Sequence, residues 1–122
     1  TNTPANRYQW ITNAPSGDTP DWILNTPFPN AQLGPNITDL NLRHQAADLG
    51  HGMIRGACYI AHHYNNLVAI DGSEPEPFQE MWVLSHPDLK HIERIQVLKT
   101  FLAETLRSKK ALITGLPDTN LE

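Results

Sequence analysis

Cysteine, basic residues and long apolar runs are all scarce in this chain of 122 residues. Cys58 is the single cysteine, so an internal disulfide bond cannot form, and a reducing compartment is expected. Only nine lysines and arginines stand against 13 aspartates and glutamates. The formal net charge of −4 argues against a nucleic-acid surface, because such a surface concentrates basic side chains.

The short apolar runs exclude a membrane-spanning helix, and the N-terminus lacks the basic-then-apolar layout of a signal peptide. These absences predict a cytoplasmic chain with no membrane partner. The length suits one domain, which we expect over residues 7–112. Residues 1–6 are expected to be a disordered or cut end and residues 113–122 a flexible tail, of which 121–122 could derive from a vector.

Apolar periodicity and turn residues predict an alternating order of strands and helices. The predicted strands are 8–12, 31–37, 53–55, 67–70 and 82–84. The predicted helices hold 22–24, 39–49, 57–63 and 90–106. Such alternation favours an α/β sheet with helices on both faces.

Several residues are expected to begin or end these helices. Thr19 is the predicted N-cap of the first helix, and Thr38 or Asp39 is that of the second. Gly50 lies where a left-handed stop is expected, while Gly34-Pro35 interrupts the second strand. The buried stripe of the second helix is predicted to be Leu42, Ala46 and Leu49.

The clearest amphipathic pattern lies near the C-terminus. Its apolar residues recur at steps of three and four, which places them on one helical face. They are Ile92, Ile95, Leu98, Phe101, Leu102 and Leu106. This face either covers the core of the same small domain or has its natural partner outside this chain.

The spacing of histidines and of the single cysteine along the sequence tests two interpretations, a metal site and a catalytic pair. Six histidines suggest a metal, but His62 and His63 are adjacent and no pair of histidines is four residues apart, so no metal site is predicted. Cys58 and His62 are four residues apart and could form a nucleophile and base on one helical face. No orienting third group is evident, and a buried, inert Cys58 is the simpler interpretation.

The glycines around His51 do not form a dinucleotide-binding turn, because they follow a helix and lack a third glycine at the required offset. The turn of Thr38 and Asp39 is more informative. It follows a strand and opens a helix, and ligands of open α/β sheets meet the carboxyl ends of strands. Thr38 is therefore either a simple N-cap or a ligand contact as well.

Residues 39–60, with AADLGHGM at 46–53 and CYIA from 58, resemble the effector-binding domain of LysR-type transcriptional regulators. The resemblance continues through Leu67-Val68 to MWVLSHPDL at 81–89 and covers nearly the whole chain. Members usually carry Leu-Pro where this sequence has Gly56-Ala57, so a looser turn is expected there.

The resemblance implies a type II periplasmic-binding-protein-like fold, of which this chain would be the second subdomain with the strand and helix that return toward the first. It implies a bacterial regulator whose partners are a small-molecule effector and, through an N-terminal winged helix-turn-helix outside this chain, DNA. It implies a homodimer, without catalysis or cofactor, and the unpartnered apolar face of the C-terminal helix predicts a homodimer or domain-swapped oligomer of this chain. The effector would contact Asn36, Ile37, Thr38 and Asp39, and Gly50 and Gly52 would be structural. The alternatives are a small enzyme using Cys58 and His62, or a solute-binding module without DNA function.

Overall fold

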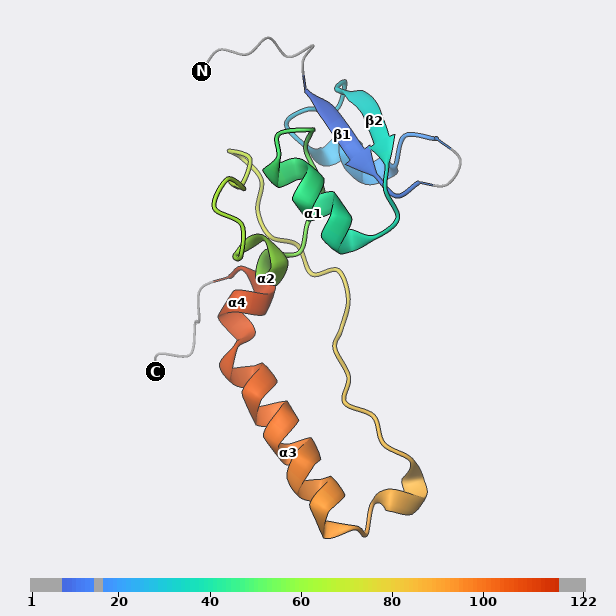
Figure 1. Cartoon of the computed structure of the whole chain (residues 1–122), viewed down its shortest axis with the longest axis vertical. Coiled ribbons are helices and arrows are strands. Elements are labelled where there is room, and N and C mark those ends of the chain that lie inside the picture. Colours follow the sequence, from blue (N-terminus) through green and yellow to red (C-terminus); the bar gives the residue numbers. More distant parts are fainter. Residues whose placement is uncertain (1–7, 15–16, 117–122) are drawn as a thin grey trace. The chain divides into compact units, whose positions relative to one another are not determined.

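The structure is a computed structural model that describes residues 8–14 and 17–116. The chain divides into two compact units, residues 1–74 and 75–122 (Figure 1). Across the described residues it is a small mixed α/β protein with a two-stranded parallel sheet and helices α1 to α4. The predicted α/β class is therefore confirmed at this level.

The sheet of the first unit joins β1 (Gln9–Thr12) to β2 (Gln32–Asn36), in agreement with the first two predicted strands. Trp10 pairs with Leu33, and Thr12 pairs with Asn36, so β2 has one more residue than β1 between the two pairs. The irregularity lies at Gly34-Pro35, where the sequence predicted an interruption. A bulge tolerates proline because the missing N–H is not needed there.

The predicted strand 53–55 is reduced to one residue, Met53, which forms a parallel bridge with Trp10. The Met53 amide donates to the Gln9 carbonyl, and the Ile11 amide donates to the Met53 carbonyl, both at 2.8 Å. Gly52 permits this approach, since a Cβ there would lie 2.7 Å from the Gln9 carbonyl oxygen. Gly52 thus has a structural role beside the sheet.

Aromatic and aliphatic side chains form the core of the first unit. Trp10, Ile11 and Ile23 are buried, and Ile23 comes from the 3₁₀ helix Asp21–Asn25, so the predicted helix at 22–24 is confirmed. The Trp22 ring meets the Trp10 ring edge-on at 5.1 Å. The prediction of Thr19 as N-cap is wrong, because Pro20 occupies that position and makes no side-chain cap.

Helix α1 (Leu40–Asp48) begins after Asp39 and is followed by Leu49 and Gly50, close to the predicted bounds. Gly50 has φ +84°, and its amide and that of His51 donate to the Ala47 and Ala46 carbonyls. This is the left-handed stop predicted from the sequence. The predicted buried stripe is wrong: Leu42 and Leu49 are 53% and 74% exposed, and the buried residue of the helix is His44.

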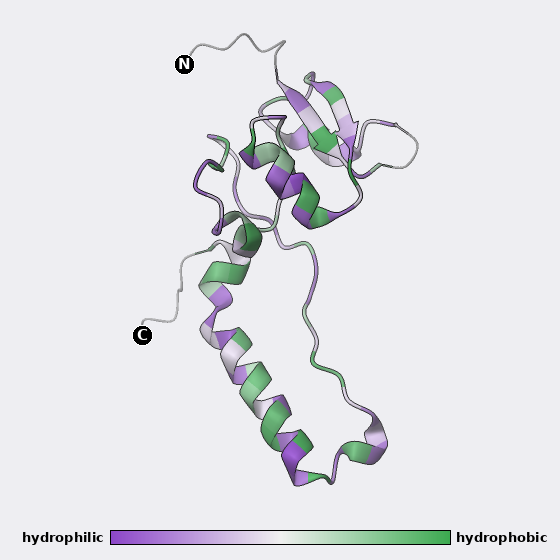
Figure 2. Ribbon diagram, viewed as in Figure 1, coloured by the Kyte–Doolittle hydropathy of each residue, from purple (hydrophilic) through white to green (hydrophobic). Residues whose placement is uncertain are grey.

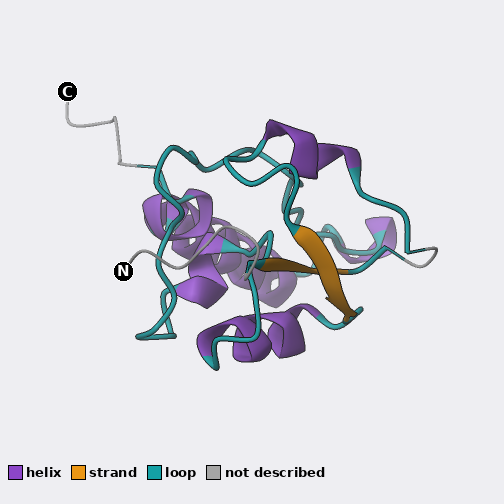
Figure 3. Cartoon of the chain, turned by 90° about the horizontal axis from the view of Figure 1, so that it is seen from above, coloured by secondary structure: helices purple, strands orange, loops and turns teal. Residues whose placement is uncertain are grey.

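Helix α2 (Cys58–Ala61) lies within the predicted helix 57–63. The predicted strand 67–70 is absent, and these residues form a loop with Val68 85% exposed. A strand requires a neighbour for its N–H and C=O groups, and none pairs with residues 67–70 in the described chain. Loops accordingly occupy much of the view in Figure 3.

The second unit contains the 3₁₀ helix Pro87–Leu89, α3 (Glu93–Ser108) and α4 (Lys110–Thr114). The predicted helix 90–106 is confirmed with later bounds, but the strand predicted at 82–84 is wrong, because residues 75–86 have no regular structure. α4 extends past the predicted domain end at 112. The rest of the predicted tail, 117–122, and the predicted N-terminal end, 1–6, lie outside the described residues.

No residue of α3 is buried, and apolar positions alternate with polar ones along its length (Figure 2). Within the described residues, no helix combines the length and the apolar content that a membrane span requires.

Candidate functional site

The strand-to-helix turn 36–39 connects the carboxyl end of β2 to the first residue of α1. The Ile37 amide donates to the Thr12 carbonyl at 2.8 Å, and the Asn36 side-chain amide donates to the Ala14 carbonyl. The turn is therefore tied to the last residue of β1 and to the segment that follows it. All four predicted effector contacts lie together at this edge of the sheet.

Within the turn, capping belongs to Asp39. Its Oδ1 accepts a hydrogen bond from the Leu42 amide at 2.8 Å, which satisfies one donor of the first helical turn. Thr38 is exposed, and its hydroxyl makes no hydrogen bond in the described part of the chain. The interpretation of Thr38 as the N-cap is thus wrong, and its hydroxyl is left available to solvent or a ligand.

Arg43 is a site residue that the sequence interpretation missed. Its Nη1 donates to the Ile37 carbonyl at 2.9 Å and to the Thr38 carbonyl at 3.1 Å. The guanidinium therefore holds the turn from the first turns of α1. A cation near a helix N-terminus interacts unfavourably with the helix dipole. The placement of Arg43 there was the feature of the sequence that could have identified it as a site residue.

The charges at this turn have opposite signs. Arg43 has no ion pair among the described residues, and it retains further N–H donors beyond the two carbonyl contacts. The negative charge at the turn is the Asp39 carboxylate, which caps α1. A hydroxyl, a guanidinium and helix N–H groups suit a small polar ligand that accepts hydrogen bonds.

His44 fixes α1 against the start of α2. It is fully buried, its Nδ1 lies 2.8 Å from the Leu40 carbonyl, and its Nε2 accepts from the Ala57 amide at 3.1 Å. A Cβ on Gly56 would lie 2.7 Å from Nε2. The Gly56-Ala57 pair is therefore fitted to the histidine, and the turn is held firmly where the sequence predicted a loose one.

The Cys58–His62 pair is less organised. The sequence interpretation expected Cys58 to be buried, but it is half-buried, and its thiol makes no hydrogen bond within the described residues. His62 is exposed, and its ring lies 5.9 Å from the His63 ring. The two side chains share a helix without a hydrogen bond that would activate the thiol.

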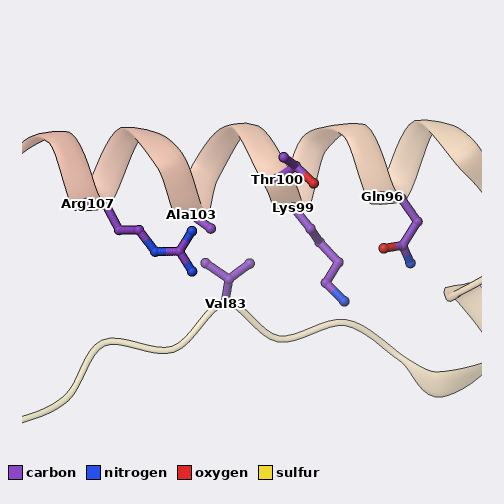
Figure 4. Close-up of a pocket in the computed structure, with 6 residues that line it drawn as sticks. All are labelled: Val83, Gln96, Lys99, Thr100, Ala103 and Arg107. Carbon is purple, nitrogen blue, oxygen red and sulfur yellow. The ribbon is translucent and has the colours of Figure 1, made fainter.

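Other hollows and clusters add little to this site. Among the described residues, no group of three histidine, cysteine or acidic side chains could hold a metal ion. A shallow open hollow in the second unit lies between Val83 and α3, where Val83 points toward Ala103 with Arg107 and Lys99 on either side (Figure 4). The turn 36–39 thus remains the candidate site.

No family model, curated protein or solved structure matches the chain.

Proposed function

We propose that this chain is the ligand-sensing portion of a bacterial LysR-type regulator and that a small-molecule effector binds at the turn 36–39. The observation that carries the proposal is the Thr38 hydroxyl, which is exposed and unbonded in the described chain while Asp39 caps α1. It lies after a parallel strand and before a helix, where open α/β sheets bind ligands.

In this proposal, residues 7–112 belong to a type II periplasmic-binding-protein-like domain. The parallel β1–β2 pair and the Met53 bridge support that topology, because both are parallel pairings joined by crossover segments. Effector binding would close two subdomains and rearrange a dimer. DNA would be contacted by a winged helix-turn-helix outside this chain, and catalysis and cofactors have no part in the proposal.

The test replaces Thr38 by valine in the full regulator, which removes the hydroxyl and keeps the shape. A thermal-shift screen of small polar metabolites on the wild-type protein first identifies an effector. We expect Thr38→Val to raise the half-maximal effector concentration about three- to tenfold, the value of one hydrogen bond, with operator affinity unchanged.

Thr19→Val is the matched control, because Thr19 is also exposed but lies outside the turn. It should leave the dose response unchanged. An unaltered dose response in Thr38→Val would overturn the assignment of the turn as the effector site.

A further inference from the structure

Asp71-Gly72 is the only place in the chain where an aspartate or an asparagine precedes a glycine. In such a pair the glycine amide nitrogen can attack the side-chain carboxyl of the aspartate, because glycine has no Cβ to obstruct the approach. We propose that Asp71 is a modification site, at which the chain forms a succinimide and then isoaspartate. This modification does not depend on the effector or on the turn 36–39.

The reaction needs no reagent other than water. The Gly72 nitrogen bonds to Cγ of Asp71, the amide hydrogen and the carboxyl OH leave together as water, and a five-membered ring closes. Hydrolysis of this ring at the main-chain carbonyl takes up one water and leaves the main chain running through Cβ and Cγ. The product keeps the mass and the net charge of the original chain, because an α-carboxylate replaces the side-chain carboxylate.

Asp71 and Gly72 occupy the two central positions of a β-turn in the loop after α2. The Ser73 amide donates to the Ile70 carbonyl at 3.0 Å, and Gly72 has φ +82°. Among the described residues only glycines have positive φ, so φ of Asp71 is negative and the turn is type II. The turn therefore favours glycine directly after the aspartate.

The peptide group between Asp71 and Gly72 is held by no hydrogen bond within the described residues. The Gly72 amide donates to no group there, and the Asp71 carbonyl accepts from none. Type I and type II turns differ in the orientation of this central peptide, so it can rotate while the outer hydrogen bond of the turn remains. Such a rotation is what ring closure requires, since it brings the Gly72 nitrogen to the carboxyl carbon.

Asp39 is arranged in the opposite way. Its Oδ1 accepts a backbone amide of α1 at 2.8 Å, and the next residue, Leu40, has a side chain that crowds its amide nitrogen. Asp71 is exposed, and its carboxylate forms no hydrogen bond or ion pair in the described part of the chain. Asp71 should therefore react well before Asp39.

Ageing the full chain of 122 residues at neutral pH and body temperature tests the proposal. Isoaspartate is counted by carboxyl methylation with S-adenosylmethionine and an isoaspartyl methyltransferase, and it is located by peptide mapping. We expect about tenfold more isoaspartate at Asp71 than at Asp39, which corresponds to a barrier lower by about 1.4 kcal/mol. Asp71→Glu should remove this signal, because a glutamate would have to close a six-membered ring.

Asp21→Glu is the matched control. Asp21 is also exposed, but it precedes Trp22, so the same exchange should leave the yield of isoaspartate unchanged. A synthetic peptide of residues 67–77 supplies the rate without the fold. The folded chain should react within about tenfold of that rate, because the central peptide of the turn is unbonded.

Three results would overturn the proposal. The first is isoaspartate spread evenly over the aspartates, and the second is an unchanged yield in Asp71→Glu. The third is a folded chain that reacts more than about tenfold more slowly than the peptide, which would mean that the turn protects Asp71.

Discussion

The two units of the chain differ in what their apolar residues contact. The buried residues of the described chain all lie in the first unit, and they are Trp10, Ile11, Thr12, Ile23 and His44. Residues 75–116 contain none, although they include large apolar side chains such as Trp82 and Phe101, which are exposed. The first unit is therefore stabilised by tertiary packing. The second depends on local helical hydrogen bonds, which are marginal for a helix of 16 residues.

The two tryptophans offer the sharpest test of this difference. Trp10 is 2% exposed and donates from Nε1 to the Phe28 carbonyl at 3.0 Å, whereas Trp82 is 72% exposed. Trp10→Ala should lower the free energy of unfolding by about 3–5 kcal/mol, and Trp82→Ala by less than about 0.5 kcal/mol. Urea denaturation followed by far-UV circular dichroism measures both. Equal losses would mean that Trp82 is also packed.

A smaller loss is expected at the junction of α1 and α2. Ala57→Pro removes the amide that donates to the buried His44 Nε2, and the native φ of −98° suits proline poorly. We expect a loss of about 1–3 kcal/mol in the same urea experiment, the cost of a buried acceptor without a donor.

Ala69→Pro is the control for the junction. Ala69 lies in the loop after α2, and its amide makes no hydrogen bond within the described residues, so the loss should stay below about 0.5 kcal/mol. If Ala57→Pro were equally mild, the His44–Ala57 contact would contribute little to the first unit.

The same difference explains which strands could be predicted from the sequence. The strands 8–12 and 31–37 formed because each supplies the other with hydrogen-bond partners. Residues 67–70 and 82–84 have equally strong strand propensity, yet no segment of the described chain pairs with them. Propensity describes a residue's fit to a sheet, and the partner strand is a tertiary property that local sequence does not contain.

The candidate site was predictable in place and less so in detail. A strand end, Thr38-Asp39 and an apolar helix located the turn. The choice of Asp39 over Thr38 as the cap depends on backbone geometry, since both residue types cap well. His44 was missed as a core residue because its burial requires two specific partners, the Leu40 carbonyl and the Ala57 amide. Such partners are not visible from helical periodicity.

The smallest predicted effect is a difference in urea midpoint between substitutions at two helix ends that have similar backbone conformations. Gly50 and Gly115 follow α1 and α4 at φ +84° and +69°, so alanine should add about 1 kcal/mol of local strain at either position. Gly50→Ala should lower the urea midpoint, because α1 unfolds with the buried His44. Gly115→Ala should leave the midpoint unchanged and only speed hydrogen exchange at its own amide, which donates to the Ala111 carbonyl at 2.9 Å. Since α4 buries no side chain, its last turn can fray without unfolding anything else. A matching midpoint shift in both variants would mean that α4 unfolds together with the core of the first unit, and the contrast between the two units would be lost.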